Sequence, residues 1–274
     1  MFDQRRWKCY TGNMKKRLDT LIFDKGLVAS REKAQRMIMA GLVLVGGKTA
    51  DKPGMSYPED ANIEILKVPQ YVGRGAEKMA GASLAFALDF HGKIVADIGS
   101  STGGFTDYAL QNGAKKVYAI DVGTGQLDWG LRSDPRVVVM ENTNARYLEN
   151  LPEPIDIFVI DVSFISLKKV LPTLKRVMSH ESRVNDNKDG VHNSQLITHN
   201  SSIVALFKPQ FEASKDIADK YRGVITDGKI HEKLLASFRH WCGENDFEIL
   251  GEARSPLVGD KGNKEFFFRL RARG

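Results

Sequence analysis

The sequence predicts an α/β protein in which a doubly wound, mainly parallel sheet follows a small α+β unit. Apolar, β-prone runs alternate with amphipathic stretches from residue 76 onward, the pattern of a sheet covered by helices on both faces. The first of these runs, 94–98, leads through a glycine-rich turn into a helical stretch that reaches Leu110. Residues 17–66 have a different pattern, which predicts two short helices and then a few short strands.

The small unit carries a local signal for each of its elements. We expect a first helix that ends at Gly26 and a second helix that runs from Ser30, its N-cap, to Gly41. Short apolar runs at 42–45 and 63–66 predict strands.

The larger domain shows strand and helix signals in alternation. Strands are expected at 94–98, 117–121, 136–140, 155–160, 203–207, 247–251 and 265–270. Helical stretches are expected at 76–88, 105–110, 123–131, 167–178 and 230–241. In the first of these helices, the apolar positions are expected to be Met79, Leu84, Ala85 and Leu88.

Composition divides the chain into four parts. The polar, aperiodic start predicts a disordered leader, and Pro69 predicts an extended linker because proline disfavours helix in the residue before it. Residues 180–202 are polar and rich in Asn and Ser, which predicts a flexible surface insertion. The expected parts are a leader (1–14), the small unit (15–66), a linker (67–75) and the larger domain (76–274).

Charge and cysteine content limit the functions that the chain can have. The net charge is +6, and residues 1–66 hold 12 Lys and Arg against 8 Asp and Glu, so a polyanion partner is favoured at that end. Only Cys9 and Cys242 occur, which predicts neither a disulfide framework nor a metal site. No apolar run is long enough to span a bilayer and no signal-peptide core is present, so we expect a cytoplasmic protein.

The glycine-rich turn predicts a nucleotide site. Segment 97–104, with the pattern D-x-G-x-S-x-G-G, lets the backbone approach a ligand just before a helix N-terminus offers unpaired N–H groups. Asp121 ends the second apolar run, 24 residues after Asp97, where nucleotide-binding α/β folds hold ribose hydroxyls. The segment lacks the Gly-Lys-Ser/Thr of nucleoside triphosphatases and departs from the dinucleotide fingerprint.

An ordered set of motifs in the small unit resembles an S4-type RNA-binding domain. The motifs are Arg17-Leu-Asp19, Ser30-Arg-Glu-Lys-Ala34, Ile38-x-x-Gly41-x-Val-x-Val-x-Gly47 and Lys52-Pro53. The resemblance implies that the two helices form the RNA face, although scattered cations are often no more than a solvated surface. The implied RNA contacts are Lys15, Lys16, Arg17, Arg31, Lys33 and Arg36, with Arg74 expected as a further contact.

The glycine-rich segment resembles the first motif of class I S-adenosylmethionine-dependent methyltransferases. The resemblance implies a Rossmann-like, mainly parallel seven-stranded sheet with helices on both faces, and S-adenosylmethionine as the cofactor. It implies that Asp121 holds the ribose and that Asn144 and Ala145 lie at the adenine edge. The full set of implied cofactor-binding residues is Asp97, Gly99, Ser101, Thr102, Gly103, Gly104, Asp121, Asn144 and Ala145.

Four further residues follow the order of a catalytic tetrad. Lys78, Asp161, Lys208 and Glu265 resemble the Lys-Asp-Lys-Glu set of FtsJ-like RNA 2′-O-methyltransferases, and three of them lie at or beside predicted strand ends. Ligands of open α/β sheets bind at such ends, so these side chains are expected to converge. Their alternative interpretation is a set of structural ion pairs.

Longer motifs match one family more closely. They are Arg74-Gly-Ala-Glu-Lys78, Ser101–Thr106, Asn142–Arg146, Asp161–Leu167, Lys208–Glu212 and Gly262–Glu265. With the S4-like unit they resemble, over about 15–272, the TlyA family of ribosomal RNA cytidine 2′-O-methyltransferases, which also carries the name hemolysin A. The chain departs from the family in the linker, where Pro69-Gln-Tyr-Val72 replaces an Arg-x-Trp-Val pattern, and in the 180–202 insertion.

The resemblance implies a reaction that needs a base. A ribose 2′-OH is a poor nucleophile, so a side chain must remove its proton as the oxygen attacks a methyl group. Lys208 is the expected base, although a lysine is ordinarily protonated at neutral pH. Positive charge from Lys78 and from a sulfonium would favour its neutral form, whereas Asp161 and Glu265 would oppose this and are expected to position the lysines and the ribose.

Two functions from other classes remain as alternatives. A membrane-active cytolysin, suggested by the older family name, needs a spanning segment or a strongly amphipathic basic helix, and the sequence has neither signal. A ribosome-assembly factor that binds RNA without catalysis would have no need of the complete tetrad. Leakage of liposomes separates the first alternative from the methyltransferase, and a methyl-transfer assay separates the second.

Overall fold

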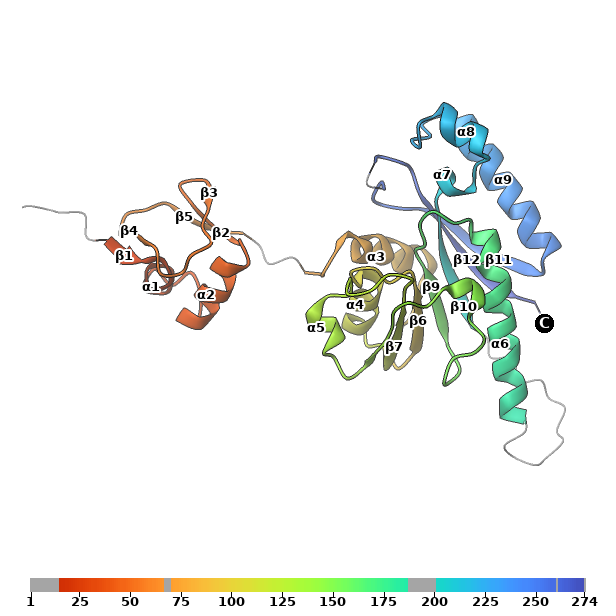
Figure 1. Cartoon of the computed structure of the whole chain (residues 1–274), viewed down its shortest axis with the longest axis horizontal. Helices are drawn as coiled ribbons and strands as arrows, with labels where there is room; N and C mark the ends of the chain where they lie inside the picture. The colour runs from red at the N-terminus through yellow and green to blue at the C-terminus, as the bar shows by residue number, and fades with distance from the viewer. Residues whose placement is uncertain (1–14, 67–69, 187–200, 260, 274) are drawn as a thin grey trace, which may run out of the picture. The chain divides into compact units, whose positions relative to one another are not determined.

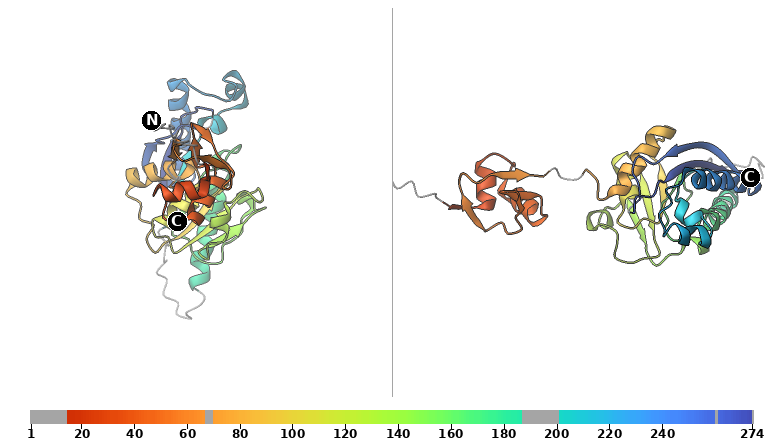
Figure 2. Two further views of the ribbon diagram at one scale, coloured as in Figure 1. Left: turned by 90° about the vertical axis from the view of Figure 1, so that its left-hand side faces the viewer. Right: turned by 90° about the horizontal axis from the view of Figure 1, so that it is seen from above.

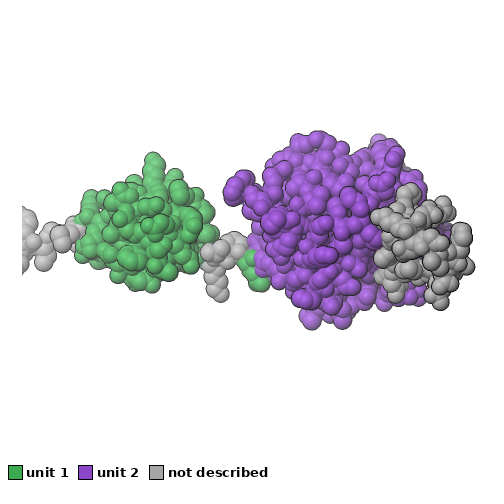
Figure 3. All heavy atoms as spheres, turned by 90° about the horizontal axis from the view of Figure 1, so that it is seen from below, with its two compact units in different colours: residues 1–70 green, residues 71–274 purple. Residues whose placement is uncertain are grey.

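The fold was analysed in a computed structural model, which describes residues 15–66, 70–186, 201–259 and 261–273. The chain forms two compact units, residues 1–70 and 71–274 (Figure 3). The predicted leader (1–14) and part of the predicted linker (67–69) lie outside the described residues. The finer predicted boundaries stay predictions.

The first unit packs two helices on short strands. Helices α1 (Leu18–Asp24) and α2 (Arg31–Met39) are followed by β2 (Val43–Val45), β3 (Lys48–Thr49) and β5 (Ile63–Ile65), which form a sheet in the order β3-β2-β5. Ser30 caps α2, as predicted, because its side chain accepts a hydrogen bond from the Lys33 N–H at 3.2 Å. Strands β1 (Lys15–Arg17) and β4 (Ser56–Pro58) form a separate antiparallel pair that the sequence pattern did not predict.

The core of this unit comes from the predicted helical faces. Leu18 and Ile22 of α1 pack with Ala34 and Ile38 of α2 and with Val43 of β2, and none of these side chains is exposed. Burial of apolar surface at about 25 cal/mol per Å² is the main stabilising term in so small a unit. The predicted two-helix, short-strand unit is therefore confirmed.

The second unit is a seven-stranded sheet with helices on both faces (Figures 1 and 2). Its strands, in chain order, are β6 (Ile94–Ile98), β7 (Lys116–Ile120), β8 (Val137–Met140), β9 (Ile157–Ile160), β10 (Ser202–Phe207), β11 (Phe247–Arg254) and β12 (Phe266–Ala272). In the sheet they lie in the order β11-β12-β10-β9-β6-β7-β8. All neighbouring pairs are parallel except the two that involve β12, so β12 alone runs against the others.

The helices complete two hydrophobic cores, one on each face of the sheet. Helices α3 (Arg74–Phe86) and α4 (Gly104–Gln111) cover one face, and α6 (Leu171–Asp186) and α9 (Gly228–Glu244) cover the other (Figure 2). Alternate residues of each strand point to opposite faces, as in the pair Val95 and Ala96 of β6. Shorter helical segments are α5 (Trp129–Arg132), η1 (Ala145–Tyr147), η2 (Leu167–Lys169), α7 (Pro209–Glu212) and α8 (Lys215–Lys220).

Three predicted details differ from the structure. Leu84 of α3 is 86% exposed, Ala85 is also exposed and Leu88 follows the helix, whereas Met79 is buried as predicted. The buried stripe is formed by Ala76, Met79, Ala82 and Phe86. The spacing of these four residues is 3, 3 and 4, which keeps them on one helical face.

The other two differences concern helix limits. The predicted helix 123–131 is only α5, because the N–H groups of Gly123 and Gly125 bind the carboxylates of Asp121 and Glu141 instead of helical carbonyls. Helix α6 extends to Asp186, into the predicted insertion 180–202, because a helix satisfies its own backbone hydrogen bonds even where its residues are polar. Residues 187–200 of that insertion lie outside the described residues.

Candidate active site and RNA-contact residues

One edge of the sheet gathers most of the predicted site residues. Parallel strands β6, β9 and β10 end at Ile98, Ile160 and Phe207, directly before Gly99, Asp161 and Lys208. Because β12 runs antiparallel, its amino end lies at this same edge, and the register pairs Phe207 of β10 with Phe266 of β12. Glu265 therefore lies beside Lys208.

The four residues of the predicted tetrad form two ion pairs. The Lys78 ammonium donates to the Glu265 carboxylate at 2.7 Å, and the Lys208 ammonium lies 2.6 Å from the Asp161 carboxylate. Lys208 also donates to the Ser163 hydroxyl at 2.9 Å. Lys78, Lys208 and Glu265 are buried, so water does little to weaken these pairs. Each lysine thus has a fixed carboxylate partner.

Three cavities meet at these pairs. A cavity of about 300 Å³ is lined by the glycine-rich turn and by Lys78, Asp161, Ser163 and Lys208. A second cavity of about 560 Å³ shares Lys78, Ser163 and Lys208 with the first and continues to Phe164, Phe211, Arg222 and Glu265. A third, also of about 560 Å³, shares Asp161 and Ser163 with the first and continues to Asp121, Asn144, Ala145 and Arg146. We name these the turn cavity, the outer cavity and the acid cavity.

The glycines of the turn are required by close contacts. Gly99 has φ +84°, and a Cβ there would lie 2.6 Å from the Asp161 carbonyl oxygen, so the turn after β6 packs directly on the end of β9. Gly103 has φ +98°, and a Cβ there would meet the side chain of Leu131. At Gly104, a Cβ would lie 2.9 Å from the Cα of Gly75, which holds α4 close to α3. Glycine alone satisfies these positions.

Asp97 presents an unsatisfied oxygen at the turn cavity. Its Oδ2 accepts hydrogen bonds from the Thr106 N–H at 3.0 Å and the Thr106 hydroxyl at 2.7 Å, whereas Oδ1 is buried and has no partner among the described residues. Burial, with a smaller contribution from the negative charge of Asp161, raises the pKa of Asp97 to about 7. A cationic donor such as an ammonium group would satisfy Oδ1 and favour the ionised carboxylate.

The raised pKa of Asp97 predicts that Asp97→Asn stabilises the protein at alkaline pH. A folded-state pKa above the unfolded value near 4 means that stability falls as pH rises from about 4 to about 7, and the loss is complete above this range. At pH 8 the variant should melt on the order of 5 °C higher than the parent, and at pH 5 the two should differ little. Thermal unfolding from pH 5 to pH 8.5 checks this. An equal shift at every pH would contradict it.

Asp121, Asn144 and Ala145 line the acid cavity, but two of them also serve the local backbone. The Asp121 carboxylate accepts from the N–H groups of Ser101 at 2.9 Å and Gly123 at 2.7 Å, and Asn144 caps η1 by accepting from the Arg146 N–H at 3.1 Å. A carboxylate has about four acceptor sites, so Asp121 keeps capacity for hydroxyl donors. Ser101 and Thr102 lie at the turn cavity, where Ser101 has a positive φ of 48°.

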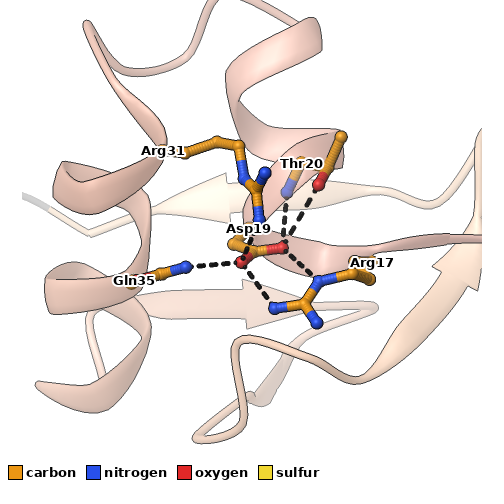
Figure 4. Close-up of polar contacts among 5 residues, drawn as sticks. All are labelled: Arg17, Asp19, Thr20, Arg31 and Gln35. Atoms are coloured by element: carbon orange, nitrogen blue, oxygen red, sulfur yellow. Dashed lines mark hydrogen bonds and ion pairs between the residues drawn. The ribbon is translucent and has the colours of Figure 1, made fainter.

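The predicted RNA contacts of the first unit divide into paired and unpaired cations. Figure 4 shows that Arg17, Arg31, Thr20 and Gln35 converge on the fully buried Asp19. The two Arg17 hydrogen bonds are 3.1 and 2.9 Å long, and these donors hold the pKa of Asp19 well below its usual range. About half of each arginine side chain stays exposed. Arg31, with Gln35, therefore braces α2 against α1, whereas the Arg17 contact is local to the start of α1.

The remaining predicted contacts are more exposed. Lys16 pairs with Asp24 at 3.2 Å and Glu59 at 3.1 Å, whereas Lys15, Lys33 and Arg36 form no ion pair with any described residue. Unpaired cations are free to bind phosphates without first breaking a contact. Arg74, in the second unit, lines the turn cavity and donates to the Val258 carbonyl at 2.9 Å.

Several residues at the site carry no prediction from the sequence. Phe164 is 91% exposed, has a positive φ of 62°, and lies 5.1 Å from the Phe211 ring. Glu212 holds the segment that follows Asp161, because its carboxylate accepts from the Ser166 hydroxyl at 2.5 Å and the Leu167 N–H at 2.6 Å. Burial raises the pKa of this carboxyl. Phe164, Phe211 and Glu212 lay within the quoted motifs, which was the one available signal.

The fold is that of a class I methyltransferase. A structure from Listeria monocytogenes described as an S-adenosylmethionine-dependent methyltransferase shares this fold at 14% identity, with a TM-score of 0.50 over 74% of this chain and 100% of that chain. The sequence model of the FtsJ-like methyltransferase family matches residues 71–272, and that of the S4 domain matches residues 16–63. The chain combines these two domains and belongs to the TlyA family.

The similarity to known proteins covers nearly the whole chain. The 16S/23S rRNA (cytidine-2′-O)-methyltransferase TlyA of Mycobacterium tuberculosis is 38% identical over 93% of this chain and 89% of its own length. Hemolysin A of Brachyspira hyodysenteriae is 36% identical over 91% of this chain and 97% of its own. A solved structure from Streptococcus thermophilus is 38% identical, with a TM-score of 0.64 over 95% of this chain and 89% of that one. The predicted family and fold are thus confirmed.

In the parts of the chain that the structure describes, no helix has the length and apolar character needed to cross a bilayer. Over the same residues, no group of three or more His, Cys, Asp and Glu side chains is arranged to hold a metal ion.

Proposed function

We propose that the protein transfers a methyl group from S-adenosylmethionine to the ribose 2′-OH of cytidine in ribosomal RNA. The observation that carries the proposal is that Lys78, Ser163 and Lys208 line both the turn cavity and the outer cavity, so that ligands of the two cavities would meet at the lysines. The Mycobacterium tuberculosis and Campylobacter jejuni relatives, which are 38% and 30% identical, are named as cytidine-2′-O-methyltransferases, and this supports cytidine as the target. Such an enzyme works in the cytoplasm, where ribosomal RNA is found.

The residues of the turn cavity and the acid cavity fit S-adenosylmethionine. Asp97 Oδ1 would accept from the α-ammonium group, and the spare acceptor sites of Asp121 would receive the ribose hydroxyls. Asn144 and Ala145 would lie along the adenine, and Ser101, Thr102 and the three glycines would line the methionine. When bound, this cofactor supplies an electrophilic methyl group on a sulfonium.

Four side chains would then act on the ribose. Lys208 would act in its neutral form: its Nζ would accept the proton of the 2′-OH as the oxygen attacks the methyl group, and Asp161 and Ser163 would hold that Nζ in place. Lys78, fixed by Glu265, would hold the attacking oxygen in position, since it lines the same two cavities as Lys208. Burial of the pairs excludes water from the proton transfer.

Transfer of tritium from labelled S-adenosylmethionine to purified ribosomal subunits tests the proposal. The expected product is labelled ribosomal RNA whose 2′-O-methyl group blocks alkaline cleavage at a cytidine. Incorporation into a base, or none into either subunit or free ribosomal RNA, would contradict the proposed reaction. Calorimetric titration with S-adenosylmethionine separates loss of cofactor binding from loss of chemistry.

We also propose that the S4 unit binds the RNA through the unpaired cations. Arg36→Ala should weaken binding of ribosomal RNA by roughly threefold to tenfold and lower the slope of log affinity against log salt by about 0.7 to 0.9, because one phosphate contact is lost. Its thermal stability should not change, since Arg36 has no ion pair with a described residue. Filter binding at several salt concentrations measures this.

Lys48→Ala is the matched control for Arg36→Ala. It removes one exposed cation from β3 of the same unit, away from the two helices. We expect a smaller change in the salt slope. Equal slopes for both variants would indicate general attraction by positive charge and would contradict a specific contact at Arg36.

A further inference from the structure

The outer cavity has a wall that does not belong to the sheet. It is formed by α8 and the turn that follows it, residues 221–225, which face the segment that leads into β12. Arg222 and Gly223 of this turn both line the cavity. The backbone at both is left-handed, with φ +48° at Arg222 and φ +76° at Gly223. An arginine rarely adopts this conformation, and such strain concentrates at functional sites.

Two buried polar side chains fix this turn in place. The Asn263 side-chain oxygen accepts from the Ile225 N–H at 2.9 Å, and its amide group donates to the Gly223 carbonyl at 2.8 Å. The His231 Nε2 lies 2.9 Å from the Ile225 carbonyl. Asn263 is 3% exposed and His231 is 4% exposed, so these bonds are protected from water. The turn is therefore held from both the β12 side and α9.

The ion pairs at the outer cavity distinguish Arg222 from Lys78 and Lys208. Lys78 and Lys208 are each neutralised by a carboxylate at 2.6 to 2.7 Å. Arg222 forms no ion pair with a residue that the structure describes, although Asp219 lines the same cavity; Lys261, a further lining cation, also has no ion pair with a described residue. An RNA strand whose ribose reaches the lysines also brings phosphates, which carry one negative charge each. A guanidinium binds a phosphate through two parallel hydrogen bonds.

We propose that Arg222 binds a backbone phosphate next to the target ribose in the outer cavity, and that Asn263 positions the turn that carries it. The inference rests on the proposed RNA methyl transfer and deepens it, because it assigns to the methyltransferase unit an RNA contact of its own. Arg222 lines the outer cavity alone and not the turn cavity, so the phosphate belongs to the RNA rather than to the cofactor.

Arg222→Gly is the informative substitution. Glycine accepts φ +48° without strain, so the variant should fold at least as stably as the parent while it lacks the guanidinium. With ribosomal subunits as the substrate, we expect KM for RNA to rise roughly 10-fold to 100-fold, with a smaller change in kcat. The salt slope of kcat/KM should fall by about 0.7. Affinity for S-adenosylmethionine should stay within twofold of the parent.

Lys220→Gly is the control, because Lys220 precedes the same turn but does not line the cavity. It should change KM by less than about twofold. An Arg222→Gly variant with unchanged KM and salt slope, measured beside an active parent, would overturn the inference and leave the proposed function intact. A parent that methylates no ribosomal RNA would instead overturn the proposed function.

A double-mutant cycle tests the positioning role of Asn263. If Asn263 acts through Arg222, Asn263→Ala should raise KM for RNA in the parent but add little in the Arg222→Gly background. A purely structural role would lower stability and activity by the same factor in both backgrounds. Additive effects on KM would overturn the positioning role.

Discussion

Replacing Lys208 with alanine is expected to lower methyl transfer by a factor of roughly 100 to 10⁴ while S-adenosylmethionine still binds. A general base contributes about this much to a rate. Lys208 lies 2.6 Å from Asp161 and 2.9 Å from the Ser163 hydroxyl, and it lines both the turn cavity and the outer cavity. The substitution removes the proton acceptor and leaves the glycine-rich turn in place. Single-turnover transfer of labelled methyl groups measures the rate of methyl transfer, and calorimetry measures the affinity for S-adenosylmethionine.

Lys93→Ala provides a matched control for this substitution. Lys93 pairs with Asp156 at 3.6 Å and precedes β6, so it is also a lysine paired with an aspartate, but at the opposite edge of the sheet. An exposed pair of this kind is worth about 0 to 1 kcal/mol, and its loss should not change the rate. Turnover by Lys208→Ala at the level of this control would exclude Lys208 as the base.

The second large effect is expected from Gly99→Ala, which should prevent cofactor binding and destabilise the protein. A left-handed alanine costs about 1 to 2 kcal/mol. Its Cβ would also lie 2.6 Å from the backbone oxygen of Asp161, and backbone cannot rotate away as a side chain can. The turn and the end of β9 must separate, which also displaces Asp161 from Lys208. We expect a decrease in Tm of about 6 to 12 °C.

Gly92→Ala separates the cost of the left-handed backbone from the cost of the overlap with Asp161. Gly92 has φ +69°, and a Cβ there would meet no atom within 4 Å, so the substitution carries the conformational cost without the overlap. Its Tm should fall by only about 2 to 4 °C, and cofactor binding should be normal. If Tm fell equally in both variants, the close contact between Gly99 and Asp161 would not contribute to the loss of stability.

Much of the sheet could be predicted because strands leave a periodic signal in the sequence. Each of the seven strands was expected within a few residues of its observed limits, since apolar runs that end at polar or glycine residues are typical of buried parallel strands. The register could not be predicted in this way. That Phe207 pairs with Phe266, and so brings Glu265 beside Lys208, depends on contacts between segments far apart in the chain.

For the RNA-contact residues, the sequence predicts the positions of the cations but not their side-chain partners. Arg17 and Arg31 are cations on the predicted face, but the sequence does not reveal that both bind the buried Asp19. Arg222 and Asn263 were not assigned roles either. Arg222 lies in an irregular turn without periodicity, and the two hydrogen bonds of the Asn263 side chain join segments 38 and 40 residues away. Side-chain partners of this kind are decided by tertiary structure.

The reversed strand β12 sets the order in which the site can be completed during synthesis. Lys78 and Glu265 are 187 residues apart, and β12 lies between β10 and β11 in the sheet. Until the last strand has been made, β11 has no neighbour to pair with and Lys78 has no carboxylate. A growing chain can therefore form the cofactor turn early and still have no complete tetrad. On the proposed mechanism, activity would begin only once β12 has joined the sheet, so a chain truncated before residue 265 would keep the glycine-rich turn but lack the carboxylate that pairs with Lys78.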